Sequence, residues 1–185
     1  MIREDIEKYC PCCEQEQKDK KLILDFMDKN EDAFERSNSV AHMTASAWVV
    51  NRERTKVLMV YHKIYDSWSW TGGHADGETD LLSTAIREVR EETGVTACPV
   101  SKDIFSLEIL TVDGHEKRGE YVSSHLHMNV TYLLEADENE KLQVCENENK
   151  GVAWFTLNGA LEASTEPWFV ERIYRKLNNK LTVLI

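Results

Sequence analysis

The segment that most constrains this chain runs from Gly72 to Val95 and reads GGHADGETDLLSTAIREVREETGV. Its first part is rich in glycine, which allows backbone conformations that side chains would block. Four apolar residues then recur at the spacing of one helical face: Leu82, Ala85, Ile86 and Val89. Thr79 and Asp80 are suited to cap the start of this helix, and Gly94 is suited to end it. The pattern predicts a glycine loop that leads into a helix from about Thr79 to Thr93.

Three glutamates, Glu88, Glu91 and Glu92, lie on one face of the predicted helix because they are spaced i, i+3 and i+4. That face borders the apolar stripe, so the carboxylates lie at the margin of the core. Glu91 and Glu92 also fall in the last turn, where the helix dipole disfavours anions. Such a group is usually a solvated acidic face. The glycine loop directly before the helix instead favours a site for a divalent cation, because Mg²⁺ prefers oxygen ligands.

These residues resemble the Nudix box, whose pattern is G-x5-E-x7-R-E-U-x-E-E-x-G-U with U an aliphatic residue. Gly73 opens the match. The residues that follow in register are Arg87, Glu88, Val89, Glu91, Glu92, Gly94 and Val95. The family's first glutamate falls on Thr79, between Glu78 and Asp80. Either the support that this glutamate gives the loop is weakened here, or the register shifts by one residue and Glu78 takes the role.

The resemblance implies a hydrolase that cleaves a diphosphate bond by water attack at phosphorus. Its substrate would be a nucleoside diphosphate derivative or a related small metabolite. Mg²⁺ or Mn²⁺ would be bound by the three glutamates, together with the backbone carbonyl of Gly73. Arg87 would orient the glutamates through a charge-assisted hydrogen bond.

The general base of the family is either a box glutamate or an acid from a loop beyond the sheet. Glu148 is the candidate for that distal acid, although a solvated acidic turn explains CENENK equally well. The alternative function is a non-catalytic Nudix-fold ligand-binding or regulatory module, which the complete set of glutamates disfavours. An isopentenyl diphosphate isomerase on the same fold would need a catalytic cysteine, and neither Cys98 nor Cys145 stands in a suitable context.

Four further residues are candidates for contact with the substrate: Trp70, His74, His125 and His127. Trp68 and Trp70 alternate before the glycine loop, and one of them could stack on a nucleobase, whereas core packing is expected for at least one. His125 and His127 form an H-x-H on a predicted strand and therefore share a face. They are candidate metal or phosphate contacts for which the sequence shows no third ligand.

The rest of the chain predicts five strands, at residues 42–50, 56–62, 103–112, 121–134 and 151–156, and two helices, at 157–164 and 167–177. Because strands and helices alternate irregularly, an α+β fold is favoured. The resemblance implies the Nudix-type α/β/α sandwich with a mixed sheet. Ile23, Phe26 and Met27 recur at helical spacing in a highly charged segment. We therefore expect an N-terminal helical extension over 1–38 and a Nudix hydrolase domain over 39–185.

The charge balance argues against a nucleic-acid duplex as partner. The 33 acidic and 22 basic residues give a net charge of −11, and no stretch is dense in Lys or Arg. A duplex binder usually presents a basic face to the phosphates. No apolar run is as long as a membrane span, and the N-terminus lacks the apolar core of a signal peptide. A cytoplasmic protein that acts on a small molecule, without membrane or duplex partners, is therefore expected.

The five cysteines fit reduced thiols better than a disulfide framework because their number is odd. Three of them form the CPCC segment at residues 10–13, but no second pair completes a zinc set. Free thiols on the helical extension are expected instead. That extension and the C-terminal helix are candidate surfaces for a homodimer.

Overall fold

The computed structural model describes residues 1–117 and 119–183. They form two compact units. Unit 1 consists of Met1–Ser46, Gly72–Ala85 and Lys102–Tyr132, and unit 2 of Ala47–Thr71, Ile86–Ser101 and Leu133–Ile185. Within the described part of the chain, no helix is both long and apolar enough to cross a membrane.

The main sheet has the strand order β10–β2–β1–β9–β5. Three further strands join it: β3 pairs with β2, β4 with β1, and β6 with β9. Its strands are β1 (Ala41–Val50), β2 (Lys56–His62), β3 (Ser67–Ser69), β4 (Thr71–His74), β5 (Cys98–Pro99), β6 (Ser106–Val112), β9 (His125–Glu135) and β10 (Asn149–Thr156). A separate hairpin pairs β7 (His115–Lys117) with β8 (Glu120–Val122). Every residue of β1 is buried, so this strand is central to the sheet.

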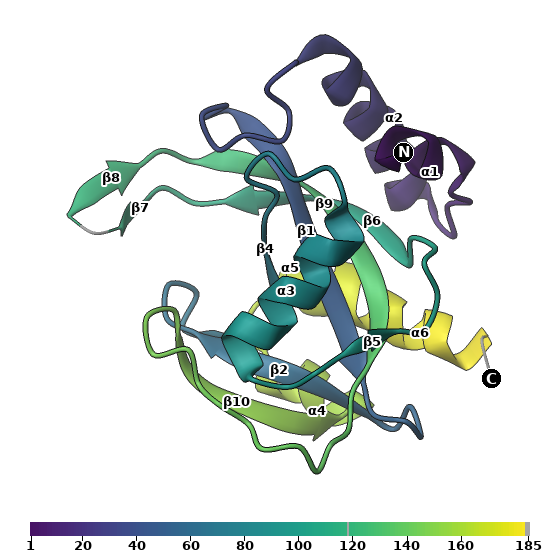
Figure 1. The fold of residues 1–185 in the computed structure, drawn as a ribbon, viewed down its shortest axis with the longest axis vertical. Helices are drawn as coiled ribbons and strands as arrows, with labels where there is room; N and C mark the ends of the chain where they lie inside the picture. Colours follow the sequence, from purple (N-terminus) through teal and green to yellow (C-terminus); the bar gives the residue numbers. More distant parts are fainter. Residues whose placement is uncertain (118, 184–185) are drawn as a thin grey trace. The chain divides into compact units, whose positions relative to one another are not determined.

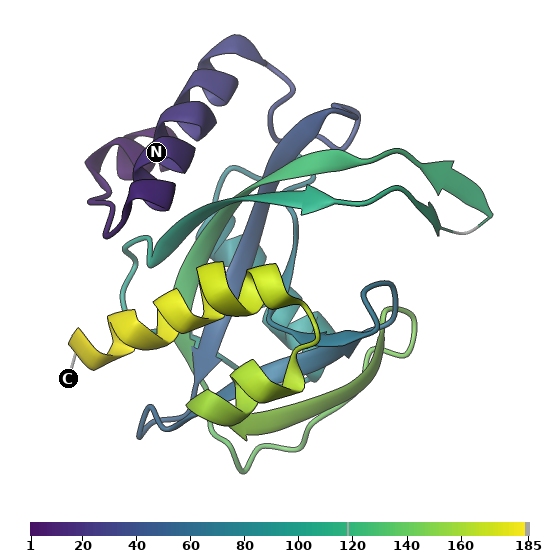
Figure 2. The ribbon, with the colours of Figure 1, turned by 180° about the vertical axis from the view of Figure 1, so that it is seen from behind.

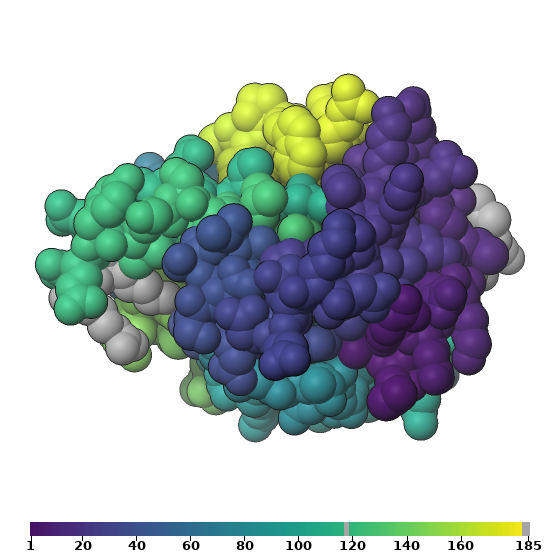
Figure 3. All heavy atoms as spheres, turned by 90° about the horizontal axis from the view of Figure 1, so that it is seen from above, coloured from purple at the N-terminus to yellow at the C-terminus, as the bar shows by residue number. Residues whose placement is uncertain are grey.

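In unit 1, helices α1 (Ile2–Lys8) and α2 (Glu14–Lys29) contact one another, and α2 packs beside β6 (Figure 1). The buried carboxylate of Glu16 accepts hydrogen bonds from the hydroxyls of Ser106 and Tyr9, both at 2.7 Å. The space-filling view shows these helices, in purple, continuous with the blue segment that leads into β1 (Figure 3). The N-terminal extension is therefore helical, as expected, but it comprises two helices that are fixed to the sheet.

In unit 2, β10 runs antiparallel to β2, from Thr156 opposite Lys56 to Asn149 opposite His62. Helix α4 (Leu157–Ala163) contacts both strands (Figure 2). The chain ends in α5 (Pro167–Phe169), a π-helical turn (Val170–Tyr174) and α6 (Arg175–Val183). The fully buried rings of Trp48 and Tyr174 stack with centroids 5.4 Å apart, which anchors this C-terminal segment to β1.

The sequence-based prediction was wrong in several segments. The glycine- and tryptophan-rich stretch predicted as a loop contains β3 and β4, because pairing with β2 and β1 overrides its turn-like composition. The strand predicted at 121–134 is divided between β8 and β9, and the strand predicted from residue 103 begins at Ser106. The helix predicted at 167–177 is interrupted by the π turn and continues to Val183. The short strands β5 and β7 were not predicted.

Candidate active site

Helix α3 (Leu81–Thr93) has the capping that its sequence predicts. The Asp80 carboxylate accepts hydrogen bonds from the Ser83 backbone N–H at 3.1 Å and from the Ser83 hydroxyl at 2.7 Å. Gly94 follows the last turn with φ 76°, the left-handed conformation that ends helices. The helix begins two residues after the predicted start, because Asp80 and not Thr79 supplies the cap.

The three glutamates of α3 differ in exposure, as expected for a face at the margin of the core. The side chain of Glu88 is 13% exposed and that of Glu91 is 58% exposed. Glu92 is 4% exposed. The Nη1 of Arg87 lies 2.8 Å from Glu88 Oε1 and 3.5 Å from Glu91 Oε2. The guanidinium therefore joins two of the three carboxylates, and the orienting role that the resemblance implies for Arg87 stays a prediction.

The electrostatic environment of Glu88 disfavours its charged form. Burial raises the pKa of Glu88 above its usual value, and the charges of Glu91 and Glu148 raise it further. Arg87 acts in the opposite direction and lowers the pKa of Glu88. Because the charge of Glu148 raises the pKa of Glu88, Glu148 is counted with the α3 carboxylates in one acidic cluster. A cation at this acidic cluster would therefore be bound by charges that repel one another without it.

Asn149 is part of this cluster and was not identified from the sequence. Its side chain is 1% exposed, and its Nδ2 donates to Glu92 Oε1 at 3.3 Å. Among the described residues its Oδ1 has no hydrogen-bond partner. The Glu148 backbone next to it is tied to β2 through a 3.0 Å hydrogen bond from the Lys63 N–H to the Glu148 carbonyl. No local pattern marked Asn149, because the chain brings it to α3 only through the pairing of β10 with β2.

These groups have the chemistry of a divalent hard-cation site. Glu88, Glu91 and Glu92 offer carboxylate oxygens from one helix face, and the buried Oδ1 of Asn149 is a further oxygen whose hydrogen-bonding capacity is unused. Mg²⁺ takes such oxygen ligands and keeps several waters. The oxygen atoms of these side chains are of the type that Mg²⁺ prefers, and their role as metal ligands stays a prediction.

The glycine segment belongs to unit 1. A Cβ at Gly72 would lie 2.5 Å from the Ser46 hydroxyl and 2.7 Å from the Ala45 carbonyl, so the approach of β4 to β1 requires glycine there. Gly73 is the next residue of β4, and its role as a metal ligand stays a prediction. Glu78 accepts a 2.8 Å hydrogen bond from the Asp80 N–H and so supports the start of α3.

A compact cluster of histidines also lies in unit 1. We call it the four-histidine cluster; its members are His42, His74, His125 and His127. Burial lowers the pKa of His42, and it lowers that of His127 to about 2 with help from the neighbouring imidazoles. Sequence reasoning found three of the four as candidate substrate contacts and missed His42. The sequence signal that could have identified His42 is its position at the start of the strand that pairs with the glycine segment.

The two tryptophans before the glycine segment occupy different environments in unit 2. Trp70 is 7% exposed and packs edge-on against Tyr174, with ring centroids 5.8 Å apart. It therefore has the packing role that was expected for at least one of the pair. Trp68 is half-buried and packs edge-on against Phe155 at 4.8 Å.

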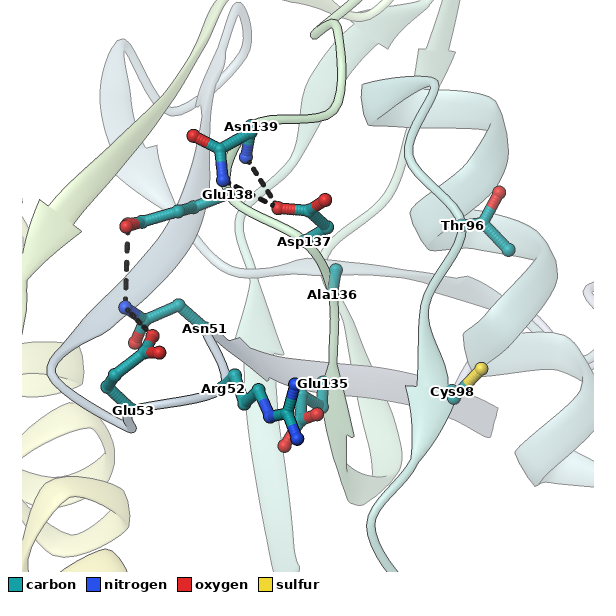
Figure 4. A pocket seen from close by; sticks show the side chains of 10 residues that line it. All are labelled: Asn51, Arg52, Glu53, Thr96, Cys98, Glu135, Ala136, Asp137, Glu138 and Asn139. Atoms are coloured by element: carbon teal, nitrogen blue, oxygen red, sulfur yellow. Dashed lines mark hydrogen bonds between the residues drawn. The ribbon is translucent and has the colours of Figure 1, made fainter.

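Unit 2 contains a cavity of about 550 Å³ near the turn that follows β1. Its lining includes Glu135, Asp137 and Glu138, and none of the α3 glutamates. Figure 4 shows the side chains of this lining and the hydrogen bond from Asn51 to Glu138, which measures 3.4 Å. The cavity is therefore lined by a different set of residues from the α3 cluster, and none of the residues predicted to act in catalysis reaches it.

Comparison with known proteins identifies relatives for most of the chain. Residues 40–177 match the family model described as NUDIX domain. A "Probable DHNTP pyrophosphohydrolase" of Lactococcus lactis is 28% identical over 120 residues, which are 65% of this chain and 69% of that protein. The human "Nucleoside diphosphate-linked moiety X motif 6" is 25% identical over 140 residues, which are 74% of this chain but only 42% of that protein.

Solved structures share the fold at lower identity. An Ap4A hydrolase of C. elegans aligns with TM-score 0.53 and 19% identity over 77% of this chain and 96% of its own. A hydrolase of the NUDIX family from Clostridium perfringens aligns with TM-score 0.54 and 19% identity, over 78% and 98% of the two chains. The α+β fold class expected from the sequence is confirmed.

Proposed function

Because this chain belongs to the Nudix family and is a Nudix pyrophosphohydrolase, we propose that it hydrolyses a diphosphate bond in a nucleoside diphosphate derivative or a related small metabolite. The reaction is water attack at phosphorus and depends on Mg²⁺ or Mn²⁺. The names of two relatives support this substrate class. One is called a pyrophosphohydrolase, and the name of the other refers to a nucleoside diphosphate-linked moiety.

The observation that carries the proposal is the pair of shielded carboxylates on α3. Glu88 and Glu92 are largely buried within one helical turn of each other, and burial raises the pKa of Glu88. A purely structural helix end would favour Lys or Arg here because of the helix dipole. Without a cation, these buried carboxylates destabilise the helix end. With a cation, their charges would be neutralised and they would serve as ligands.

Each side chain has a distinct role in this proposal. Glu88, Glu91 and Glu92 would hold the divalent cation, and the carbonyl of Gly73 is the further ligand that the resemblance to the Nudix box implies. A divalent cation held there would supply charge neutralisation at the phosphates and would lower the pKa of a water molecule. Arg87 fixes the orientation of Glu88 and Glu91 through its ion pairs.

Two residues of the β10 region complete the site. Asn149 holds the Glu92 carboxylate by the hydrogen bond from its amide. Glu148, whose charge acts on Glu88, is the proposed acceptor of the proton from the attacking water. In this proposal the substrate is a small molecule, and neither a membrane nor a nucleic-acid duplex is a partner.

The test measures product release from a panel of diphosphates with Mg²⁺ or Mn²⁺. The panel contains ADP-ribose, NADH, dinucleoside polyphosphates, nucleotide sugars, and oxidised and normal nucleoside triphosphates. A Glu88→Gln, Glu92→Gln double variant is compared with Glu162→Gln, a matched change at an exposed residue of α4. We expect metal-dependent turnover that is lost in the double variant and retained in Glu162→Gln.

Two outcomes would contradict the proposal. Turnover that continues in the double variant would remove the α3 carboxylates from the reaction. Tight, metal-independent binding of one compound without turnover would instead identify a ligand-binding or regulatory module.

A further inference from the structure

We propose that the four-histidine cluster of unit 1 is a Zn²⁺ site, separate in its ligand chemistry from the carboxylate site of α3. The four residues come from three strands, β1, β4 and β9, which lie far apart in the sequence. Each offers one imidazole nitrogen, and these nitrogens all lie within 4.8 Å of one another. Imidazole nitrogen is a preferred ligand of Zn²⁺ and a poor ligand of Mg²⁺.

The distances suit a tetrahedral ion. A Zn–N bond of about 2.0–2.1 Å places tetrahedral ligand atoms about 3.3–3.4 Å apart. The Nε2 atoms of His125 and His127 are 3.1 Å apart. The ring centroid of His42 lies 5.0 Å from the centroids of His74 and His125 and 5.1 Å from that of His127. The other ligand nitrogens, all within 4.8 Å of one another, would have to draw closer for one ion to bind all four.

Hydrogen bonds on the far side of two rings fix the tautomer that a metal needs. His42 Nδ1 lies 3.0 Å from the Asn38 carbonyl, and His125 Nδ1 lies 2.8 Å from the Ser123 carbonyl. A carbonyl accepts but does not donate, so each Nδ1 carries the proton and each Nε2 presents a lone pair. This is the outer-shell pattern that orients histidine ligands in metal sites.

The buried Nε2 of His42 is an independent observation in favour of a ligand. His42 is 4% exposed, and among the described residues its Nε2 has no hydrogen-bond partner. A contact between His125 and His127 alone would explain their proximity but would leave this atom unsatisfied. Buried polar atoms without partners are rare and costly, and an ion at the centre of the cluster accounts for this one.

The positive charge of Arg36, which lowers the pKa of His42 and His127, is offset by a carboxylate. The guanidinium of Arg36, whose charge reaches His42 and His127, is paired with the Asp76 carboxylate through two hydrogen bonds. Four imidazoles fill the tetrahedral positions, so the ion would be structural and would join β4 to β1 and β9. Because β4 leads into the segment that starts α3, the ion would order the approach to that helix.

The experiment is a titration of the chelator-stripped full chain with Zn²⁺ alone, followed by calorimetry, and with Co²⁺, whose absorption spectrum reports tetrahedral nitrogen ligation. His42→Gln is compared with His115→Gln, because His115 also bonds a carbonyl through Nδ1 but lies outside the cluster. We expect one Zn²⁺ per chain in the wild type and in His115→Gln. Affinity should fall about 100-fold or more in His42→Gln, since loss of an outer-shell partner alone costs about 10–100-fold.

A second variant keeps the test decisive if His42→Gln does not fold. His125 is more exposed than His42, so His125→Gln is expected to fold and to weaken Zn²⁺ binding to a similar degree. The Glu88→Gln, Glu92→Gln double variant should bind Zn²⁺ as the wild type does, which separates this site from the proposed hydrolase site. Equal Zn²⁺ affinity in the wild type and in both histidine variants, or no Zn²⁺ binding by the wild type, would overturn the proposal.

Discussion

Asn149→Ala isolates the support that β10 gives to the carboxylate site. The change removes the 3.3 Å hydrogen bond to Glu92 Oε1 and leaves a carboxylate that is 4% exposed without that donor. A hydrogen bond to a charged group contributes about 1.5–3 kcal/mol. In a chain of this size, where each kcal/mol corresponds to about 2–4 °C, the melting temperature should fall by about 3–12 °C. Since outer-shell partners tune metal affinity, half-saturation by Mg²⁺ should rise about 10–100-fold.

Thermal and urea unfolding followed by circular dichroism measure the loss of melting temperature and of unfolding free energy, and hydrolysis as a function of Mg²⁺ concentration measures the change in metal affinity. Asn147→Ala, at an exposed position of the preceding turn, is the matched control and should change neither quantity. A loss of stability below about 0.5 kcal/mol, the range of neutral surface changes, together with unchanged Mg²⁺ dependence, would refute the role of Asn149.

Three further changes test the surrounding structure. Gly72→Ala should destabilise the fold by about 1–3 kcal/mol in urea unfolding, because its Cβ would meet the Ser46 hydroxyl at 2.5 Å; a neutral effect would contradict the close strand approach. Asp80→Ala should cost about 0.5–2 kcal/mol by removing the cap of α3, and replacement by Asn should recover most of it. Burial raises the pKa of Glu166 to about 7, so the stability of the wild type should fall as pH rises through 7. Glu166→Gln should therefore be more stable than the wild type at pH 8 and no more stable at pH 4, and parallel pH profiles would contradict this assignment.

The sequence predicted those parts of the molecule whose causes are local. Helix α3 carries its own apolar stripe, its own cap at Asp80 and its own terminator at Gly94, so periodicity and residue type were sufficient. The contact of Arg87 with Glu88 and Glu91 agrees with what the resemblance to the Nudix box implies, and its role in catalysis stays a prediction. The N-terminal extension is helical as expected, but its attachment through the hydrogen bond from Ser106 to Glu16 could not be predicted, because the two residues lie far apart in the sequence.

Features that depend on distant pairing were not accessible from the sequence. Strands β3 and β4 contain glycine and serine, and only pairing with β2 and β1 makes them strands. Asn149 reaches Glu92 through the register of β10, and His42 joins the other histidines through the pairing of β1 with its neighbours. In each case a side chain with no local signal becomes part of a site because a strand carries it there.

The most direct test of the central claim is hydrolysis in water enriched in ¹⁸O, with the best substrate of the panel and mass spectrometry of the products. Water attack at phosphorus predicts one ¹⁸O atom on a phosphate of one product, formed only with Mg²⁺ or Mn²⁺ and not by the Glu88→Gln, Glu92→Gln double variant. Label in a fragment without phosphate, with the diphosphate left intact, would contradict the claim. Labelled product from the double variant at the wild-type rate would do the same.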